Sequence, residues 1–421
     1  MNPQAATPAL TSTSAANEVQ EIIAGQVDVD RIRKFLHDVA PTRLLQTLRD
    51  ALPAPETAQF RLVRTRLKPG RKLVAFFDVS GGGSSPRPIA VTWSTDSPMK
   101  VLVAPQDPTF PQLPRLYDAN HMIRIVESVS GRMSVEELTV TPIRYRPGQR
   151  HMLRIDGPSA SDRLYAKTYR DDTGALAVAR ARTFQSALAA WGGPARTAHP
   201  YGYVASDRLA LWADSGGKAL SQVVAGAPEA AEVAGAALRA LHDSRQGPEA
   251  NRFAGTTDAA AEGRSTARAV EHVEVLRPGT GQRLARLLHL AVGGLMDLPD
   301  ETGYPLHGDY KCDNILAGDD GLSILDFDRA TIGDPALDLG KFCADLQWWA
   351  AEAGSPADHL VAAFAEGYGD CPPLRWERAG HYDLLFQLRA SGRRVTLHDE
   401  HWAERVDACV ENAATRESRQ R

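Results

Sequence analysis

The sequence predicts an α+β fold, with paired strands concentrated in the first half and helices filling most of the second half. A strand–turn–strand pattern with a central Pro-Gly occurs at residues 64–79 and again at residues 141–156. Gly tolerates the positive φ that such turns need, so each copy predicts a β-hairpin. After residue 215, apolar and aromatic residues recur at several helix-like spacings, which indicates a largely helical region.

Length and composition are those of a globular chain of two or three domains or lobes, with 421 residues and a net charge of −4. A nucleic-acid or acidic-membrane partner is not expected at this charge. No apolar run approaches the ~20 residues of a membrane span. The N-terminus lacks the basic segment and apolar core of a secretory signal, so residues 1–18 are expected to be a disordered lead-in. The four cysteines are far apart, which favours reduced thiols in a cytoplasmic protein.

Residues 18–52 are expected to be helical, because Val29, Ile32, Leu36 and Val39 recur at steps of three and four. Pro41 is expected to divide this run into two helices. A pair of packing helices in front of the first hairpin is therefore predicted.

The two hairpins are copies of one module. Gly70 aligns with Gly148, an offset of 78 residues. The same offset aligns three pairs of basic residues: Arg66 with Arg144, Lys68 with Arg146, and Lys72 with Arg150. A further short strand is expected after each hairpin, with Thr92 in the first copy near the position that Lys167 has in the second.

The most informative stretch lies at residues 307–342, which contain eight aspartates and no glutamate. A stretch with aspartate but no glutamate suggests carboxylates that are held close to the backbone, at turns or at metal sites. His307, Asp309 and Asn314 match H-x-D-x-x-x-x-N, the spacing of a kinase catalytic loop. A mostly apolar run then leads into Asp-Phe-Asp at 326–328, where a protein kinase carries D-F-G.

Together these motifs resemble those of the aminoglycoside phosphotransferase and choline kinase family. The resemblance is carried by His-Gly-Asp at 307–309, Asn-Ile-Leu at 314–316, Asp-Phe-Asp at 326–328, and Gly-Asp-Pro at 333–335 followed by Asp338-Leu339. Gly308 stands where protein kinases usually have Arg, which favours the small-molecule branch. The resemblance implies a bilobal protein-kinase-like fold, with a small β-rich N-lobe and a large helical C-lobe. Here a helical segment and a duplicated β-hairpin module would precede it.

The resemblance also implies roles for the motif residues in phosphoryl transfer. Asp309 would be the general base, and His307 would brace the catalytic loop through hydrogen bonds rather than transfer protons. Asn314 and Asp326 would bind Mg²⁺, with Asp328 assisting the metal or binding substrate.

Residues of the second hairpin module are the candidates for nucleotide binding. Lys167 would pair with the phosphates of ATP or GTP. Gly148 and Arg150 would belong to the loop that covers the phosphates, although it lacks a G-x-G-x-x-G pattern. Trp212, with Ala213, would lie beside the adenine and offer backbone hydrogen bonds. The first module lacks the lysine and is expected to cap the small lobe without binding nucleotide.

Two aspartates after the motifs, Asp334 and Asp338, are expected to be structural. Asp334 precedes Pro335, a strong helix start, and Asp338 lies one turn on, where the helix dipole favours a carboxylate. His242 is also expected to be structural. The aromatic residues between 348 and 402 are expected to form core, with some of them lining an acceptor pocket.

One departure from the kinase pattern keeps a second hypothesis open. The helix expected at 174–191 has no glutamate to pair with Lys167, and Gln185 is its only long polar acceptor. The chain is therefore expected to be an ATP-dependent phosphotransferase acting on a small-molecule hydroxyl, or alternatively a nucleotide-binding pseudokinase that acts as a scaffold. The acceptor, of aminoglycoside, sugar or choline type, and the oligomeric state are left open.

Four segments are expected: the lead-in at 1–18, an N-terminal cap with the degenerate repeat at 19–130, a kinase-like N-lobe at 131–214, and a helical C-lobe with the catalytic loop at 215–421.

Overall fold

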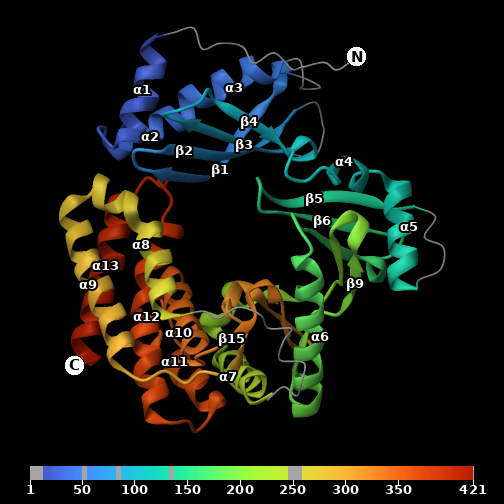
Figure 1. Cartoon of the computed structure of the whole chain (residues 1–421), viewed down its shortest axis with the longest axis vertical. Coiled ribbons are helices and arrows are strands. Elements are labelled where there is room, and N and C mark those ends of the chain that lie inside the picture. Colours follow the sequence, from blue (N-terminus) through green and yellow to red (C-terminus); the bar gives the residue numbers. More distant parts are fainter. Residues whose placement is uncertain (1–12, 50–54, 82–86, 132–136, 245–257, 421) are drawn as a thin grey trace.

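Three bodies make up the structure, a computed structural model that describes residues 13–49, 55–81, 87–131, 137–244 and 258–420 (Figure 1). They are an N-terminal module, a second sheet with its helices, and a helical C-terminal region. The α+β fold predicted from the sequence is confirmed. Of the expected lead-in, residues 13–18 belong to the first helix and residues 1–12 lie outside the described residues.

The N-terminal module consists of a helical layer and a four-stranded antiparallel sheet in the order β1-β2-β3-β4. The helical layer contains α1 (Thr13–Ala24), α2 (Val29–Lys34), a π-helical segment (Phe35–Val39) and α3 (Ala40–Leu48). The strands are β1 (Gln59–Lys68), β2 (Lys72–Ser80), β3 (Arg87–Ser94) and β4 (Lys100–Val103). The inward faces of both layers are apolar, so that the sheet and the helices share one core.

The helical segment breaks at Gly25, and the prediction that Pro41 breaks it was wrong. Gly25 has a φ of 70° just after α1, and the carboxylate of Asp28 accepts a hydrogen bond from the Arg31 amide to begin α2. Pro41 lies in the first turn of α3, where a missing N–H costs little. The widened π-helical turn directly before it keeps the helical run continuous.

The second sheet has the strand order β5-β6-β7-β10-β9 and carries its own helices. Its strands are β5 (Thr139–Arg146), β6 (Arg150–Asp156), β7 (Leu164–Thr168), β9 (Pro200–Val204) and β10 (Leu209–Ala213). Helices α4 (Leu113–Leu116) and α5 (Ala119–Ser130) bury their apolar residues against this sheet, so the expected division at residue 130 separates them from the sheet on which they pack. Helix α6 (Thr173–Trp191) follows β7.

Both copies of the repeat form the predicted hairpins, and their third strands occupy equivalent places. The turn glycines Gly70 and Gly148 have φ angles of 67° and 63°. Thr92 of β3 pairs with Val74 of β2, and Lys167 of β7 pairs with Met152 of β6. Positions 74 and 152 differ by the same 78 residues, so Thr92 is the structural equivalent of Lys167.

The C-terminal region is helical, with short strands that flank the aspartate-rich stretch at residues 307–342. Its helices are α7 (Pro228–Asp243), α8 (Ala259–Leu276), α9 (Pro278–Asp297), α10 (Ala336–Glu352), α11 (Asp358–Tyr368), α12 (Pro373–Arg393) and α13 (Trp402–Gln420). A small sheet joins β11 (Lys218–Ala219), β13 (Ile315–Gly318), β14 (Gly321–Ile324) and β8 (Ala195–Thr197), and β12 (Tyr304–Leu306) pairs with β15 (Thr331–Gly333).

Core packing ties the N-terminal module to the C-terminal helices. Buried residues of α1–α3 and β1–β3 belong to the same apolar core as the C-terminal helices, whereas α4, α5 and the second sheet form another core. Arg71, at the first hairpin turn, also forms a salt bridge of 2.6 Å with Glu271 of α8. Among the described helices, none combines the length and apolarity needed to cross a membrane.

Candidate functional site

The loop after β12 is fixed by the start of α10. Asp338, in the first turn of that helix, accepts hydrogen bonds from the backbone amides of His307 (2.7 Å) and Gly308 (2.9 Å). Asp334 lies directly before Pro335, the N-cap residue of α10, and accepts a hydrogen bond from the Ala336 amide at 3.0 Å, so it holds the start of the helix without being the cap itself. Gly308 has a φ of 71°, and a Cβ there would lie 2.2 Å from the backbone oxygen of Arg329. The Gly of the motif is therefore required by a positive φ and a close backbone approach.

His307 lies in the predicted bracing position. It is fully buried, its Nδ1 accepts from the Asp309 amide at 3.2 Å, and its Nε2 donates to the backbone oxygen of Leu325 at 2.9 Å. Burial lowers the pKa of His307, which keeps the ring neutral and both nitrogens engaged. The imidazole thus links the loop that carries Asp309 to the strand end that precedes Asp326.

Asp309 is held by two lysines and an amide. Lys341 of α10 places its Nζ 2.5 Å from Oδ1, and Lys311 places its Nζ 2.8 Å from Oδ2. The amide nitrogen of Asn314 donates to Oδ2 (3.1 Å) and to the backbone oxygen of Asp309 (2.9 Å). Burial alone would raise the pKa of Asp309, but the charges of Lys341 and Lys311 hold it well below its usual range. The carboxylate is ionised at neutral pH.

The other two candidate carboxylates converge on Lys167. Its ammonium lies 2.7 Å from Asp326 Oδ1 and 2.6 Å from Asp328 Oδ2. Arg150 adds a contact of 3.1 Å to Asp326, and the Tyr169 hydroxyl donates to Asp328 at 2.9 Å. Burial opposes ionisation of Asp326, but the charges of Lys167 and Arg150 lower its pKa far below the usual value. Lys167 and Arg150 of the second sheet thus meet the Asp-Phe-Asp turn of the C-terminal region.

The predicted magnesium ligands fit such an ion. Asp326 and Asp328 both direct an oxygen at one cationic point, as the position of the Lys167 ammonium shows. Asn314 uses its amide nitrogen on Asp309, which leaves its amide oxygen as an acceptor. Carboxylate and amide oxygens are the ligands that Mg²⁺ prefers, and this ion usually keeps water and phosphate oxygens as its remaining ligands. The described residues contain no cluster of three or more His, Cys, Asp or Glu that would form a complete cage.

Helix α6 contacts the Asp-Phe-Asp turn without a glutamate. Arg180 donates to the backbone oxygen of Asp328 at 3.0 Å, and the Phe184 ring stacks on Phe327 with 5.3 Å between centroids. Gln185, considered as a partner for Lys167, is half-buried and has its amide nitrogen 3.5 Å from His199 Nδ1. The carboxylates that pair with Lys167 thus come from the turn itself.

Among the remaining candidates for nucleotide binding, two backbone amides already donate hydrogen bonds inside the protein. The Gly148 amide donates to Asp107 at 2.9 Å, and the Tyr145 hydroxyl donates to the same carboxylate at 2.8 Å. Trp212 is half-buried in β10, at the expected strand next to β7. The amide of Ala213 donates to the backbone oxygen of His199 at 2.9 Å, so it is not free for a base, contrary to expectation.

Asp107, Arg180 and Lys341 are site residues that sequence reasoning missed. Lys341 follows Asp338 by three positions in α10, so the helical period places the two on one face, and this spacing was the available signal. Asp107 and Arg180 lie far in sequence from the residues that they hold, and no local pattern marks them.

Comparisons with known proteins agree with this geometry. A family model described as the phosphotransferase enzyme family matches residues 148–403. No curated protein matches the chain. A spectinomycin phosphotransferase solved with ADP and spectinomycin has a TM-score of 0.50 at 14% identity, over 71% of this chain and 98% of that one. The family match and this structure confirm the predicted kinase-like fold.

Two further solved structures match at lower TM-scores. A choline/ethanolamine kinase family protein from Mesorhizobium loti has a TM-score of 0.49 at 15% identity, over 70% of this chain and 94% of that one. An aminoglycoside phosphotransferase from Streptomyces rimosus has a TM-score of 0.41 at 22% identity, over 63% of this chain and 96% of that one.

Proposed function

Because the chain belongs to the phosphotransferase enzyme family and so acts on a hydroxyl group, we propose that it transfers the γ-phosphoryl group of ATP or GTP to a small-molecule alcohol with the help of Mg²⁺. The observation that carries this proposal is the meeting of Lys167 and Arg150 with Asp326 and Asp328, close to an ionised Asp309. ADP in the spectinomycin phosphotransferase favours an adenine nucleotide as the donor.

The transfer is an in-line displacement at phosphorus. The acceptor oxygen forms a bond to the γ-phosphorus while the bond from that phosphorus to the bridging oxygen breaks, and the nucleoside diphosphate leaves. The proton of the acceptor hydroxyl passes to Asp309. Since Lys341 and Lys311 keep the pKa of Asp309 low, Asp309 orients the hydroxyl and accepts its proton late, when the oxygen has already gained a bond to phosphorus.

The other site residues hold the donor nucleotide and the metal, and they keep the Asp309 loop in place. Lys167 and Arg150 provide positive charge for the donor's phosphates, and His307 and Asp338 keep the Asp309 loop in place. Asn314, Asp326 and Asp328 would hold Mg²⁺, which supplies charge against the phosphate oxygens when bound.

The test is ADP formation from Mg-ATP by the wild type and by Asp309→Asn, with nucleotide binding measured in parallel. The amide keeps the size of the side chain but removes its charge. We expect Asp309→Asn to lower turnover about 10²–10⁴-fold while ATP still binds. Equal turnover in the two proteins would contradict the role of Asp309.

The absence of a glutamate on α6 favours the pseudokinase as the second candidate. It predicts nucleotide binding without Asp309-dependent ADP formation from any acceptor. The same pair of measurements therefore separates the two functions.

A further inference from the structure

A cavity beside the proposed base is lined by five basic side chains. It measures about 120 Å³ and is bordered by Asp309 and Asp345 as its only carboxylates among the described residues. The basic residues are Lys311, Lys341, Arg389, Arg393 and Arg394. Phe386, one of the aromatic residues expected near the acceptor, also lines it, beneath the Lys341 ammonium at 5.0 Å. An acceptor that reaches Asp309 through this cavity meets a basic surrounding.

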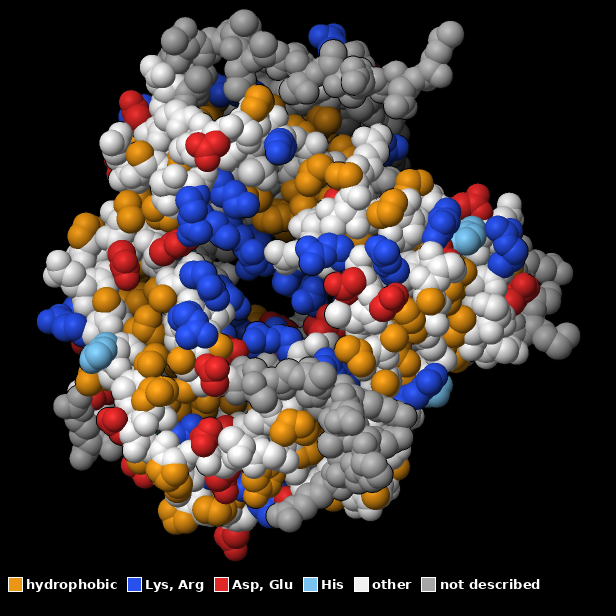
Figure 2. Space-filling model, in the orientation of Figure 1, with side chains coloured by type: hydrophobic (Ala, Val, Ile, Leu, Met, Phe, Trp, Pro, Cys, Tyr) orange, Lys and Arg blue, Asp and Glu red, His pale blue; other side chains and the backbone are white. Residues whose placement is uncertain are grey.

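The positive charge continues away from Asp309 through two further cavities. Arg393 also borders a cavity of about 300 Å³ between β1, α8 and the end of α12, which has five basic side chains and no carboxylate in its described lining. Arg64 and Arg66 are shared between that cavity and a third one of about 510 Å³. The shared residues show that the three cavities adjoin one another, and we call this row of cavities the basic channel. Figure 2 shows Lys and Arg side chains gathered around the central hollow.

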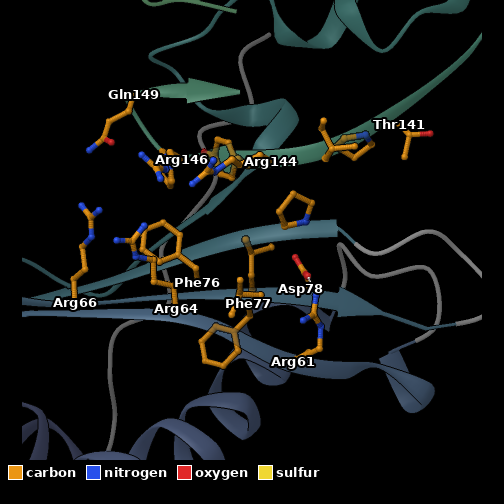
Figure 3. Close-up of a pocket in the computed structure, with 17 residues that line it drawn as sticks. Arg61, Arg64, Arg66, Phe76, Phe77, Asp78, Thr141, Arg144, Arg146 and Gln149 are labelled. Carbon is orange, nitrogen blue, oxygen red and sulfur yellow. Dashed lines mark hydrogen bonds and ion pairs between the residues drawn. The ribbon is translucent and has the colours of Figure 1, made fainter. Parts of the chain in front are cut away.

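The third cavity lies between the two repeat hairpins. Arg64 and Arg66 of β1 face Arg144 and Arg146 of β5 across it (Figure 3). Asp78 is the one carboxylate in its described lining, and Asp78 is paired with Arg61. The first module, which lacks the nucleotide lysine, thus contributes one wall of a basic channel.

Several of these cations lack a carboxylate partner. Arg389 is paired with Glu262, and Arg394 with Asp345. Among the residues that the structure describes, the guanidinium of Arg393 has the Ser265 hydroxyl, at 3.3 Å, as its one hydrogen-bond partner. Within the described parts of the chain, no ion pair with a carboxylate is formed by four further arginines of the channel: Arg64, Arg66, Arg144 and Arg146.

The cations of the channel repel one another. Desolvation, together with Arg66, Arg144 and Arg393, lowers the pKa of Arg64 to about 10. Desolvation, together with Arg389, Arg329 and Arg66, lowers the pKa of Arg393 to about 10. An anion placed among these guanidinium groups would relieve this repulsion.

We propose that the acceptor is an anion, whose hydroxyl meets Asp309 while a phosphate or carboxylate group of the same molecule binds Arg393 and its neighbours Arg64 and Arg66. Guanidinium groups bind such oxyanions through charge-assisted and bidentate hydrogen bonds. The proposal rests on the proposed phosphotransferase function and specifies its substrate class. Aminoglycosides and choline are cations, and the like charges of these guanidinium groups would repel them.

The first test measures anion binding without catalysis. Thermal unfolding is followed in sodium sulfate and in sodium chloride at equal ionic strength, with saturating Mg-ADP, for the wild type, Arg393→Gln and Arg286→Gln. Arg286 is an exposed arginine of α9 that lies outside the cavities, so its variant controls for the loss of one charge. We expect sulfate to stabilise the wild type and Arg286→Gln, and to stabilise Arg393→Gln much less. An equal sulfate effect in all three proteins, or none in the wild type, would overturn the proposal.

The second test uses matched acceptors: a hexose, its phosphate ester, the corresponding uronic acid, choline and an aminoglycoside. We expect Asp309-dependent ADP formation with the phosphate ester or the uronic acid, and a KM for that acceptor at least about tenfold higher in Arg393→Gln, because one charged hydrogen bond is lost. The KM for ATP should not change. Turnover of choline, the aminoglycoside or the neutral hexose that matches or exceeds turnover of the anions would refute the anionic acceptor. Arg393-dependent sulfate binding without ADP formation from any compound would support the anion site but contradict the phosphotransferase function.

Discussion

At the scale of single residues, Gly308 shows how the motif depends on backbone geometry. Gly308→Ala would place a Cβ 2.2 Å from the Arg329 backbone oxygen at a φ of 71°. The loop that carries Asp309 would have to move, and a displacement of about 1 Å at a reacting group can cost about 10²-fold in rate. We expect turnover to fall at least that much, measured as ADP formation at saturating ATP.

Gly70→Ala is the matched control for Gly308→Ala. Gly70 also has a positive φ, of 67°, but a methyl group added there would meet no described atom within 4 Å apart from its own neighbours in the chain. This change should cost about 1 kcal/mol of stability from backbone strain and leave turnover near that of the wild type. Equal losses of activity in the two variants would show that strain alone, and not the contact with Arg329, explains the requirement for Gly308.

His151 makes stability depend on pH. It is buried, its Nδ1 lies 3.0 Å from the Arg144 backbone oxygen, and its Nε2 lies 2.7 Å from the Tyr117 hydroxyl. Burial lowers the pKa of His151 to about 4, against the opposing influence of Arg144 and Asp107. The unfolded chain, with a histidine pKa of about 6.5, binds more protons between pH 6.5 and 4. The contribution of His151 to stability is therefore fully present above pH 6.5 and is lost as the pH falls toward 4.

Tyr117→Phe tests this pH dependence. Removing the hydroxyl that donates to Nε2 should cost about 1 kcal/mol at pH 7.5 and raise the pKa of His151 in the folded protein. The variant should then be less stable than the wild type at pH 7.5, with a smaller difference at pH 5, as measured by urea unfolding at both values. A difference that does not change with pH would contradict a neutral His151 held by Tyr117.

At the scale of elements, the two hairpin modules share a fold, but only the second is expected to bind nucleotide. Thr92 and Lys167 occupy equivalent strand positions, so exchanging each of them tests this difference. Lys167→Met would leave the carboxylates of Asp326 and Asp328 without their ammonium partner and remove a charge proposed for the phosphates. We expect kcat/KM for ATP to fall at least about 100-fold. Thr92→Val should change it less than about twofold in the same steady-state assay. A larger effect at Thr92 would mean that the nucleotide binds the first module.

The helices and strands also show which parts of the fold could be predicted from the sequence. The repeat predicted both hairpins and the position of Thr92, because a Pro-Gly turn fixes where two strands meet and the strand period fixes the rest. The helix break was misplaced at Pro41, because a proline in a first turn is tolerated and the cap at Asp28 was overlooked. The aspartate motifs predicted which candidate carboxylates would gather, but the contact of Arg180 with Asp328 depends on how α6 packs, which no local pattern encodes.

At the scale of the whole molecule, the N-terminal module and the C-terminal helices share one core, and the second sheet has its own. Phe35 and Phe110 are both fully buried, one in each core, and so form a matched pair. Phe35→Ala and Phe110→Ala should each cost about 3–5 kcal/mol in the unit that contains them. We expect Phe35→Ala to lower the temperature of the transition in which most helical signal is lost, because the core of Phe35 extends into the C-terminal helices.

Calorimetry together with circular dichroism at 222 nm distinguishes this arrangement from an independent cap. Phe110→Ala should shift the unfolding of the second sheet more than it shifts the main helical transition. If Phe35→Ala instead shifts only a minor transition and leaves the helical one unchanged, the N-terminal module unfolds by itself. Without a shared core, nothing would hold the module, and with it Arg64 and Arg66, in a fixed position over the C-terminal helices. The basic channel requires that rigidity, because an oxyanion bound between two bodies gains affinity only when their guanidinium groups are already positioned.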